Sequence, residues 1–184
     1  AAASGARLAL PLPGLFAMSY STLTEVNDFL AQRRLALVGV SRHEQDFSRT
    51  LLQALRDHGY DMVPVNPAVA EVAGLRCYAR VQDITPPVDG VLVMTPAAEA
   101  AQVVRDCIEA GIGRVWLHRG SGQGAVSPEA IELCLHSGIK LVAGQCPFMF
   151  LPEPAWFHRA HRYLKKLRGT YPTSDASAQQ RGSR

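Results

Sequence analysis

Small polar and cationic side chains follow an apolar run that breaks at a single glycine. The run Leu35-Ala-Leu-Val-Gly-Val-Ser-Arg42 is typical of a buried strand whose end turns polar at Gly39. Backbone N–H groups in such a turn, and at the start of the next helix, can bind an anion the size of a phosphate. The candidate contacts are the backbone of Gly39 and Val40 and the side chains of Ser41, Arg42, Ser48, Arg49 and Thr50.

The residues around this turn argue against two common nucleotide motifs. No glycine occurs from Val40 to Glu44, so the three-glycine dinucleotide fingerprint is absent, and no Gly-Lys-Ser/Thr triplet follows, which excludes a P-loop. The second apolar run ends in Asn66-Pro67, where a dinucleotide enzyme usually carries the Asp or Glu that binds the ribose. The pattern therefore favours a nucleotide other than NAD, although an Asn-Pro pair also simply ends a strand.

Helix and strand patterns alternate along the chain and must position these residues. A Thr22/Glu25 capping box, Ser48 as a cap and Ser127-Pro128 open three of the expected helices, which span 22–33, 48–58, 98–110, 127–138 and 153–167. Strands are expected at 35–40, 60–65, 88–94, 114–117 and 139–143. Three helices end in glycine directly before an apolar strand, which is typical of βα units. We predict an α/β fold, a Rossmann-like doubly wound five-stranded parallel sheet in three αβα layers.

In such folds, ligands bind beyond the carboxyl ends of the strands, where the strand order reverses. The segments expected at this rim are 39–42, Asn66-Pro67, Thr95-Pro96, 118–120 and 144–147. His118 and Arg119 stand at one strand end, but no carboxylate or nucleophile has a spacing that would pair with His118 in catalysis. We therefore name no catalytic residue, and no metal site, because His158 and His161 have no evident third ligand.

The same segments resemble the small stand-alone CoA-binding domain proteins of bacteria and archaea. Those proteins in turn are similar to the N-terminal domain of the succinyl-CoA synthetase alpha subunit. The resemblance covers about residues 22–147. It runs through Leu35–Arg42, His58-Gly-Tyr60, Val63-Pro-Val-Asn-Pro67, Gly74, Val88-Asp-Gly-Val-Leu-Val93, Val115-Trp-Leu117 with Gly120, and Gly138-Ile139 through Cys146-Pro147.

This resemblance implies a site for CoA or an acyl-CoA. The turn after the first strand would contact the CoA phosphates. The adenosine would lie between Val65-Asn66-Pro67 and Thr95-Pro96, and the pantetheine would run past His118, Arg119 and Gly120. The synthetase's basic residue after the second strand is not evident, since Ala68 and Val69 follow Pro67, so the ribose 3′-phosphate would fall to Arg42 or Arg49.

The resemblance also bears on catalysis. The synthetase carries its phosphorylated histidine in a second domain after the Cys-Pro segment, and only 37 residues follow Pro147 in this sequence. We therefore expect binding without ligase chemistry. Two alternatives stay open: a nucleotide-dependent, NAD(P)-type oxidoreductase using the same crevice, and a scaffold with a degenerate pocket that works through protein contacts. A protein partner or a homodimer also stays open.

Composition narrows the class of protein. Hydrophobic residues make up 47% and charged residues 19%, as in soluble globular proteins, and the net charge of +3 is too weak to suggest a nucleic-acid partner. Four cysteines without CxxC spacing favour the cytoplasm over a disulfide framework or zinc site. No membrane span is expected. We expect an N-terminal extension at 1–17, a CoA-binding domain at 18–172 and a disordered tail at 173–184.

Overall fold

The computed structural model describes residues 21–119, 124–151 and 172. Its main sheet has five strands in the order β2-β1-β5-β6-β7, and every adjacent pair is parallel. This confirms the predicted α/β fold class. The order reverses between β1 and β5, which is where such sheets bind ligands. The strands are β1 (Arg34–Val38), β2 (Asp61–Val65), β5 (Gly90–Val93), β6 (Arg114–His118) and β7 (Lys140–Gln145).

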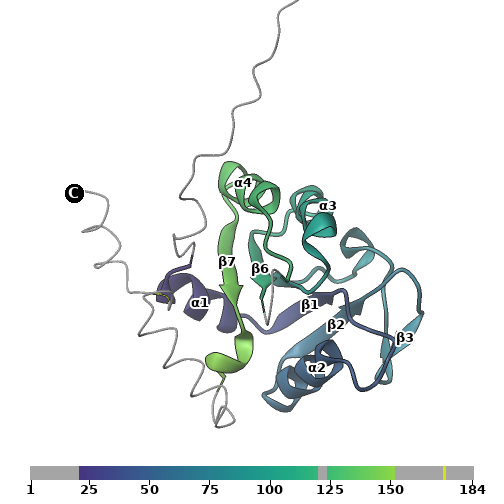
Figure 1. Cartoon of the computed structure of the whole chain (residues 1–184). Helices are drawn as coiled ribbons and strands as arrows, with labels where there is room; N and C mark the ends of the chain where they lie inside the picture. The colour runs from purple at the N-terminus through teal and green to yellow at the C-terminus, as the bar shows by residue number, and fades with distance from the viewer. Residues whose placement is uncertain (1–20, 120–123, 152–171, 173–184) are drawn as a thin grey trace, which may run out of the picture.

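Helices cover both faces of the sheet, as Figure 1 shows. Leu35 and Leu37 of β1 pack in one apolar cluster with α1 and α2, whereas Ala36 and Val38 pack in a second cluster with α3 and α4. Alternate residues of a strand point to opposite faces, so both faces of β1 are buried and its sequence is continuously apolar. The helices are α1 (Leu23–Leu30), α2 (Phe47–Asp57), α3 (Ala97–Glu109) and α4 (Pro128–His136).

The helix starts agree with the sequence at two positions and differ at a third. Thr22 and Glu25 form the predicted capping box of α1, and Ser127 caps α4, with Pro128 in its first turn. The prediction that Ser48 caps α2 is wrong. Asp46 is the N-cap, and its carboxylate accepts a hydrogen bond from the Ser48 backbone N–H at 2.8 Å. Aspartate is as good an N-cap as serine, so the helix begins earlier than the sequence pattern indicated.

Short elements between β2 and β5 were not predicted. Strands β3 (Glu71–Val72) and β4 (Leu75–Arg76) form an antiparallel hairpin, and a 3₁₀ turn, η2, follows at Val81–Asp83. Strands of two residues are too short to show an alternating pattern, which explains the omission. A second 3₁₀ turn, η3 (Pro147–Met149), follows β7. The expected helix at 153–167, the extension at 1–17 and the tail at 173–184 lie outside the described residues.

Two further features concern the cysteines and the helices of the described residues. All four cysteines, Cys77, Cys107, Cys134 and Cys146, are buried free thiols. Among the helices that the structure describes, none has the length and apolar character that crossing a bilayer requires.

Candidate nucleotide site at the strand ends

The ends of β1 and β5 come into unusually close contact at Gly39. The chain turns there with a φ of +87°, and a β-carbon on Gly39 would stand 2.8 Å from the backbone nitrogen of Thr95. The backbone N–H of Gly39 donates to the carbonyl oxygen of Val65 at 3.1 Å, which ties the turn to β2. Only glycine satisfies both the left-handed conformation and the close approach. Strand β1 consequently ends at Val38 rather than at the predicted Val40.

A cavity of about 540 Å³ opens beside this contact. Its volume lies within the range of roughly 300–1,000 Å³ that is common for small-molecule sites. Five residues predicted from the sequence line it: Gly39, Val65, Asn66, Pro67 and Thr95. The other lining residues come from β1, the 79–81 segment and one face of α3: Val38, Ala79, Arg80, Val81, Ala98, Glu99, Gln102, Val103 and Asp106.

The side chain of Asn66 stabilises the cavity wall through two hydrogen bonds. Its amide nitrogen donates to the carbonyl oxygen of Val40 at 2.7 Å, and its amide oxygen accepts from the backbone N–H of Ala68 at 2.8 Å. The first bond joins the turn after β1 to the end of β2. The second forms a local turn that ends the strand, as Asn commonly does. Asn66 therefore has a structural task whether or not it also contacts a ligand.

Polar groups at the start of α3 face the same region. Thr95 is only 8% exposed and lines the cavity, yet its hydroxyl has no hydrogen-bond partner within the described residues. An unpaired buried hydroxyl is costly, so the Thr95 hydroxyl is suited to form a hydrogen bond with a ligand in the cavity. Helix α3 begins at Ala97 with Pro96 as its N-cap and no side-chain cap. Its first N–H groups are therefore suited to an anionic ligand.

The turn after β1 does not lead directly into α2. The segment 40–46 intervenes, and Ser48, which is buried, accepts from the backbone N–H of Ser41 at 2.9 Å. Ser48 also donates to the Asp46 carboxylate at 2.6 Å. Its hydrogen bonds to Asp46, from the side chain and then from the backbone, lower the pKa of that carboxyl. The Arg49 guanidinium lies 3.5 Å from the carbonyl oxygen of Ser41. Hydrogen bonds among its own polar groups therefore stabilise this loop.

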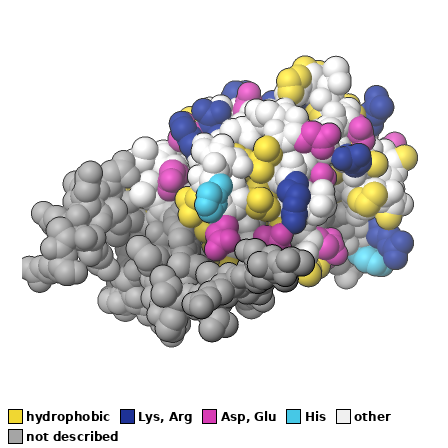
Figure 2. Space-filling view, turned by 90° about the horizontal axis from the view of Figure 1, so that it is seen from above, with side chains coloured by type: hydrophobic (Ala, Val, Ile, Leu, Met, Phe, Trp, Pro, Cys, Tyr) yellow, Lys and Arg dark blue, Asp and Glu magenta, His cyan; other side chains and the backbone are white. Residues whose placement is uncertain are grey.

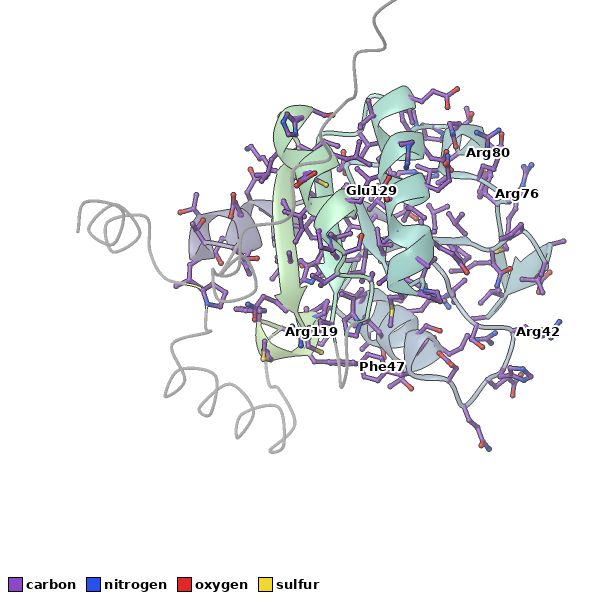
Figure 3. All side chains as sticks on the ribbon, turned by 45° about the horizontal axis from the view of Figure 1, so that its top comes forward. Arg42, Phe47, Arg76, Arg80, Arg119 and Glu129 are labelled. Carbon is purple, nitrogen blue, oxygen red and sulfur yellow. The ribbon has the colours of Figure 1, made fainter. Side chains whose placement is uncertain are left out.

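The remaining predicted site residues lie around this loop and at the end of β6. Val40 is buried, Arg42 and Thr50 are exposed, and none of the three lines the cavity. Figure 3 shows Arg42 at the outer edge of the loop, well away from Arg80. His118 is buried at the last position of β6 and Arg119 after it is exposed. Gly120 lies outside the described residues.

Aromatic residues that the sequence did not single out surround His118. The Phe47 ring at the start of α2 lies 5.4 Å from the His118 ring and 5.7 Å from the Phe148 ring, centroid to centroid. Phe47 is 42% exposed despite these contacts. The start of α2 is thereby joined to the ends of β6 and β7. We refer to Phe47, His118 and Phe148 as the aromatic group.

Charges on the α3–α4 side of the molecule are mixed. Arg105 of α3 pairs with Glu129 of α4 at 2.6 Å, and Figure 2 shows Lys and Arg side chains interspersed with Asp and Glu side chains on this face. The described residues of this face therefore form no dense basic patch of the kind that is typical of nucleic-acid binders. Within the described ranges, no three His, Cys, Asp or Glu side chains gather in a metal-binding arrangement.

A family model described as a CoA binding domain matches residues 33–152, well over half of the chain. The chain belongs to this CoA binding domain family. The match begins just before β1 and ends just after η3, so it includes the cavity and the aromatic group. The resemblance inferred from the sequence segments is confirmed.

Relatives of this CoA binding domain protein fall into two kinds. The Bacillus subtilis protein YneT is 26% identical over 130 residues, which cover 70% of this chain and 93% of YneT. An ADP-forming acetate–CoA ligase of Methanocaldococcus jannaschii is 23% identical over 118 residues, which cover 62% of this chain but 17% of the ligase. The shared region is thus nearly all of the first protein and a minor part of the second.

Solved structures of archaeal proteins share the fold. A conserved hypothetical protein of Pyrococcus furiosus superposes with a TM-score of 0.57 and 31% identity, covering 62% of this chain and 95% of that one. A hypothetical protein of Pyrococcus horikoshii gives a TM-score of 0.64 and 28% identity, covering 69% of this chain and 87% of that one.

Proposed function

We propose that this chain binds CoA or an acyl-CoA at the carboxyl ends of its parallel strands. The observation that carries the proposal is the cavity at the β1–β5 reversal, in a chain whose family is a CoA binding domain. Parallel α/β sheets bind nucleotides at this reversal. The cavity holds the adenosine, between Val65-Asn66-Pro67 on one side and Thr95 with the face of α3 on the other.

The rest of the molecule has to lie outside the cavity, because CoA is much longer than its adenosine. Its diphosphate lies at the 39–42 turn, with the Thr95 hydroxyl, the first N–H groups of α3 and the side chains of Ser41, Arg42, Arg49 and Thr50 as candidate donors. The pantetheine continues past Pro96 toward the aromatic group and Arg119. This path uses the exposed face of Phe47, which would otherwise be left partly in water.

The chemistry that we assign is binding alone. The region shared with the Methanocaldococcus ligase is 17% of that enzyme, so most of the ligase has no counterpart in this match. Neither His118 nor Cys146 has a catalytic role in the proposal. We propose a cytoplasmic binding protein for a CoA species, in which the physiological output depends on occupancy of the site.

A ligand panel measured by calorimetry and thermal shift tests the proposal. The panel is CoA, acetyl-CoA, NAD, NADP, FAD and ATP. We expect CoA or acetyl-CoA to bind and to stabilise the fold by about 2.7 kcal/mol at a hundred times Kd. Stabilisation by NAD or NADP without CoA would instead indicate the oxidoreductase alternative. No binding by any compound would favour the scaffold.

A pair of variants locates the site. Ala98→Trp places a large ring in the cavity, on an exposed helix position where the fold tolerates it. Leu135→Trp adds the same ring to α4, at a residue that is 57% exposed and does not line the cavity. We expect the first variant to lose CoA binding and the second to keep it. Equal binding by both variants would show that CoA does not enter this cavity.

A further inference from the structure

Among the described residues that line the cavity, Arg80 is the one with a cationic side chain. Arg80 was not among the predicted site residues, because it lies far along the chain from every expected strand end. In the fold, Tyr78 forms an isolated parallel bridge with Val65, and the backbone N–H of Asn66 donates to the Tyr78 carbonyl oxygen at 2.9 Å. These contacts place the 78–80 segment alongside the end of β2.

The guanidinium of Arg80 is held loosely. Its Nη2 atom lies 3.8 Å from Oδ1 of Asp106 and 3.8 Å from Oε2 of Glu109, both longer than a hydrogen bond, and the side chain is 57% exposed. The Arg80 side chain forms no hydrogen bond with the described residues that contact it. Arginine has five N–H donors in a fixed fork that matches phosphate oxygens. The side chain is therefore positioned at the cavity by long ion pairs while its donors stay available.

The end of β2 is also where a bound adenosine presents its ribose hydroxyls. In dinucleotide folds an acidic residue there binds an unmodified ribose, and an arginine nearby accommodates a ribose phosphate. This chain has no acidic side chain at Asn66-Pro67, and Arg80 stands next to that position. Arg42 and Arg49, the cations considered from the sequence, do not line the cavity.

We propose that Arg80 recognises the 3′-phosphate of CoA and so sets the preference of this site for CoA over nucleotides with a free ribose. The inference rests on the proposed function. In this arrangement Arg80 exchanges its long ion pairs for bidentate hydrogen bonds to the phosphate. Asp106 and Glu109 orient the guanidinium in the free protein and compete with the phosphate for it.

Binding of CoA and dephospho-CoA by matched variants tests the assignment. Dephospho-CoA lacks only the 3′-phosphate. We expect the wild-type protein to bind CoA about tenfold more tightly than dephospho-CoA, the effect of a charge-assisted contact at a half-exposed position. Arg80→Ala removes this preference and leaves dephospho-CoA binding unchanged, whereas Arg80→Lys retains part of it because a point charge replaces the fork.

Two further variants separate a local contact from a general charge effect. Arg76→Ala removes an equal charge from an exposed residue whose guanidinium lies over the Tyr78 ring, outside the cavity (Figure 3). It should keep the wild-type preference. Glu109→Gln removes a competing carboxylate that does not line the cavity, and should raise CoA affinity without changing dephospho-CoA affinity.

The outcomes distinguish this inference from the function on which it rests. CoA binding with equal affinity for dephospho-CoA, or a preference that survives in Arg80→Ala, would overturn the role of Arg80 and leave CoA binding intact. Absence of CoA binding in the wild-type protein would overturn both. A preference for NADP over NAD that depends on Arg80, without CoA binding, would show that Arg80 recognises the ribose phosphate of NADP. That result would refute the proposed function.

Discussion

The backbone nitrogen of Thr95 lies 2.8 Å from the point where a β-carbon on Gly39 would stand. Strands β1 and β5 diverge toward different helices at this point, so the contact holds together the two walls of the candidate site. Backbone atoms cannot move aside as a flexible side chain can. Because of this short separation, a substitution at position 39 tests whether the site depends on the close contact between the ends of β1 and β5.

Gly39→Ala should destabilise the protein by roughly 2–4 kcal/mol, because the left-handed backbone and the overlap with Thr95 each add a cost. Gly74→Ala is the matched control: its φ is +73°, but nothing lies within 4 Å of an added β-carbon. It should cost only about 1–2 kcal/mol, the conformational part alone. Urea unfolding of the two variants measures both values, and equal destabilisation would show that the overlap at Gly39 is relieved.

Thr95→Val should weaken ligand binding without weakening the fold. The hydroxyl of Thr95 is buried and has no hydrogen-bond partner among the described residues, so an isosteric methyl group removes an unsatisfied polar atom. Such a replacement is close to neutral or mildly stabilising in the free protein. If the hydroxyl donates to a CoA phosphate, its loss should reduce affinity by about tenfold.

The measurement for Thr95 combines thermal unfolding of the free protein with calorimetric titration of CoA. Thr95→Ser keeps the hydroxyl and serves as the control. A Thr95→Val protein that melts clearly below wild type would mean that the hydroxyl already has a partner in the fold. Unchanged CoA affinity would remove Thr95 from the phosphate contacts.

The sequence predicted the sheet well because parallel strands buried on both faces are continuously apolar. The strands predicted at 35–40, 60–65 and 88–94 needed no tertiary information, although the first and third end earlier, at Val38 and Val93. Five of the site residues predicted at or after their ends line the cavity. The prediction considered only strand ends and the start of the second helix, however, and Ser48, Arg49 and Thr50 of that helix do not line the cavity. Glu99, Gln102 and Asp106 lie on one face of α3 at helical spacing, a pattern that is visible in the sequence but was not used to predict the site.

Arg80 could not have been found in the same way. Its position depends on the bridge between Val65, the last residue of β2, and Tyr78, which belongs to no strand. No local pattern in 77–80 encodes that contact, because the partner is distant in sequence and the pairing is one residue long. The N-cap of α2 was predicted wrongly for a different reason. Asp46 and Ser48 are both good N-cap residues, and only the loop geometry determines which of them caps the helix.

Asp46 should make the stability of α2 depend on pH. Hydrogen bonds from Ser48 lower the pKa of its carboxyl in the folded protein, below the ordinary value of 3.8. A lowered folded pKa means that the stabilisation is present above about pH 4 and is lost as the pH falls through the folded pKa. Asp46→Ala should cost about 1 kcal/mol at pH 7, and less at a pH where the wild-type carboxyl is protonated.

Denaturant unfolding at pH 7 and at acidic pH provides the measurement for Asp46. Asp46→Asn retains an acceptor for the Ser48 N–H but cannot ionise, so its stability difference from wild type should shrink as the pH falls. A difference that stays constant across this range would show that the charge of Asp46 contributes nothing to the cap.

Phe47→Ala should weaken the binding of CoA without weakening the binding of its nucleotide part alone. Phe47 is 42% exposed and its ring lies against His118 and Phe148, on the proposed pantetheine path and outside the cavity. Loss of the ring should weaken CoA binding about tenfold, the effect expected when a ring that the ligand covers is removed. Adenosine 3′,5′-bisphosphate, which lacks the pantetheine, should bind the variant and the wild-type protein equally.

Titration of both compounds against wild type, Phe47→Ala and Leu135→Ala measures this effect. Leu135 is also an exposed apolar residue, but it lies on α4 and does not line the cavity. If Phe47→Ala weakens both ligands equally, the ring acts by holding the start of α2 and its loop in place. If it weakens neither, the pantetheine leaves the cavity by another route. Selective loss of CoA binding alone would place the pantetheine arm of the ligand beside Phe47.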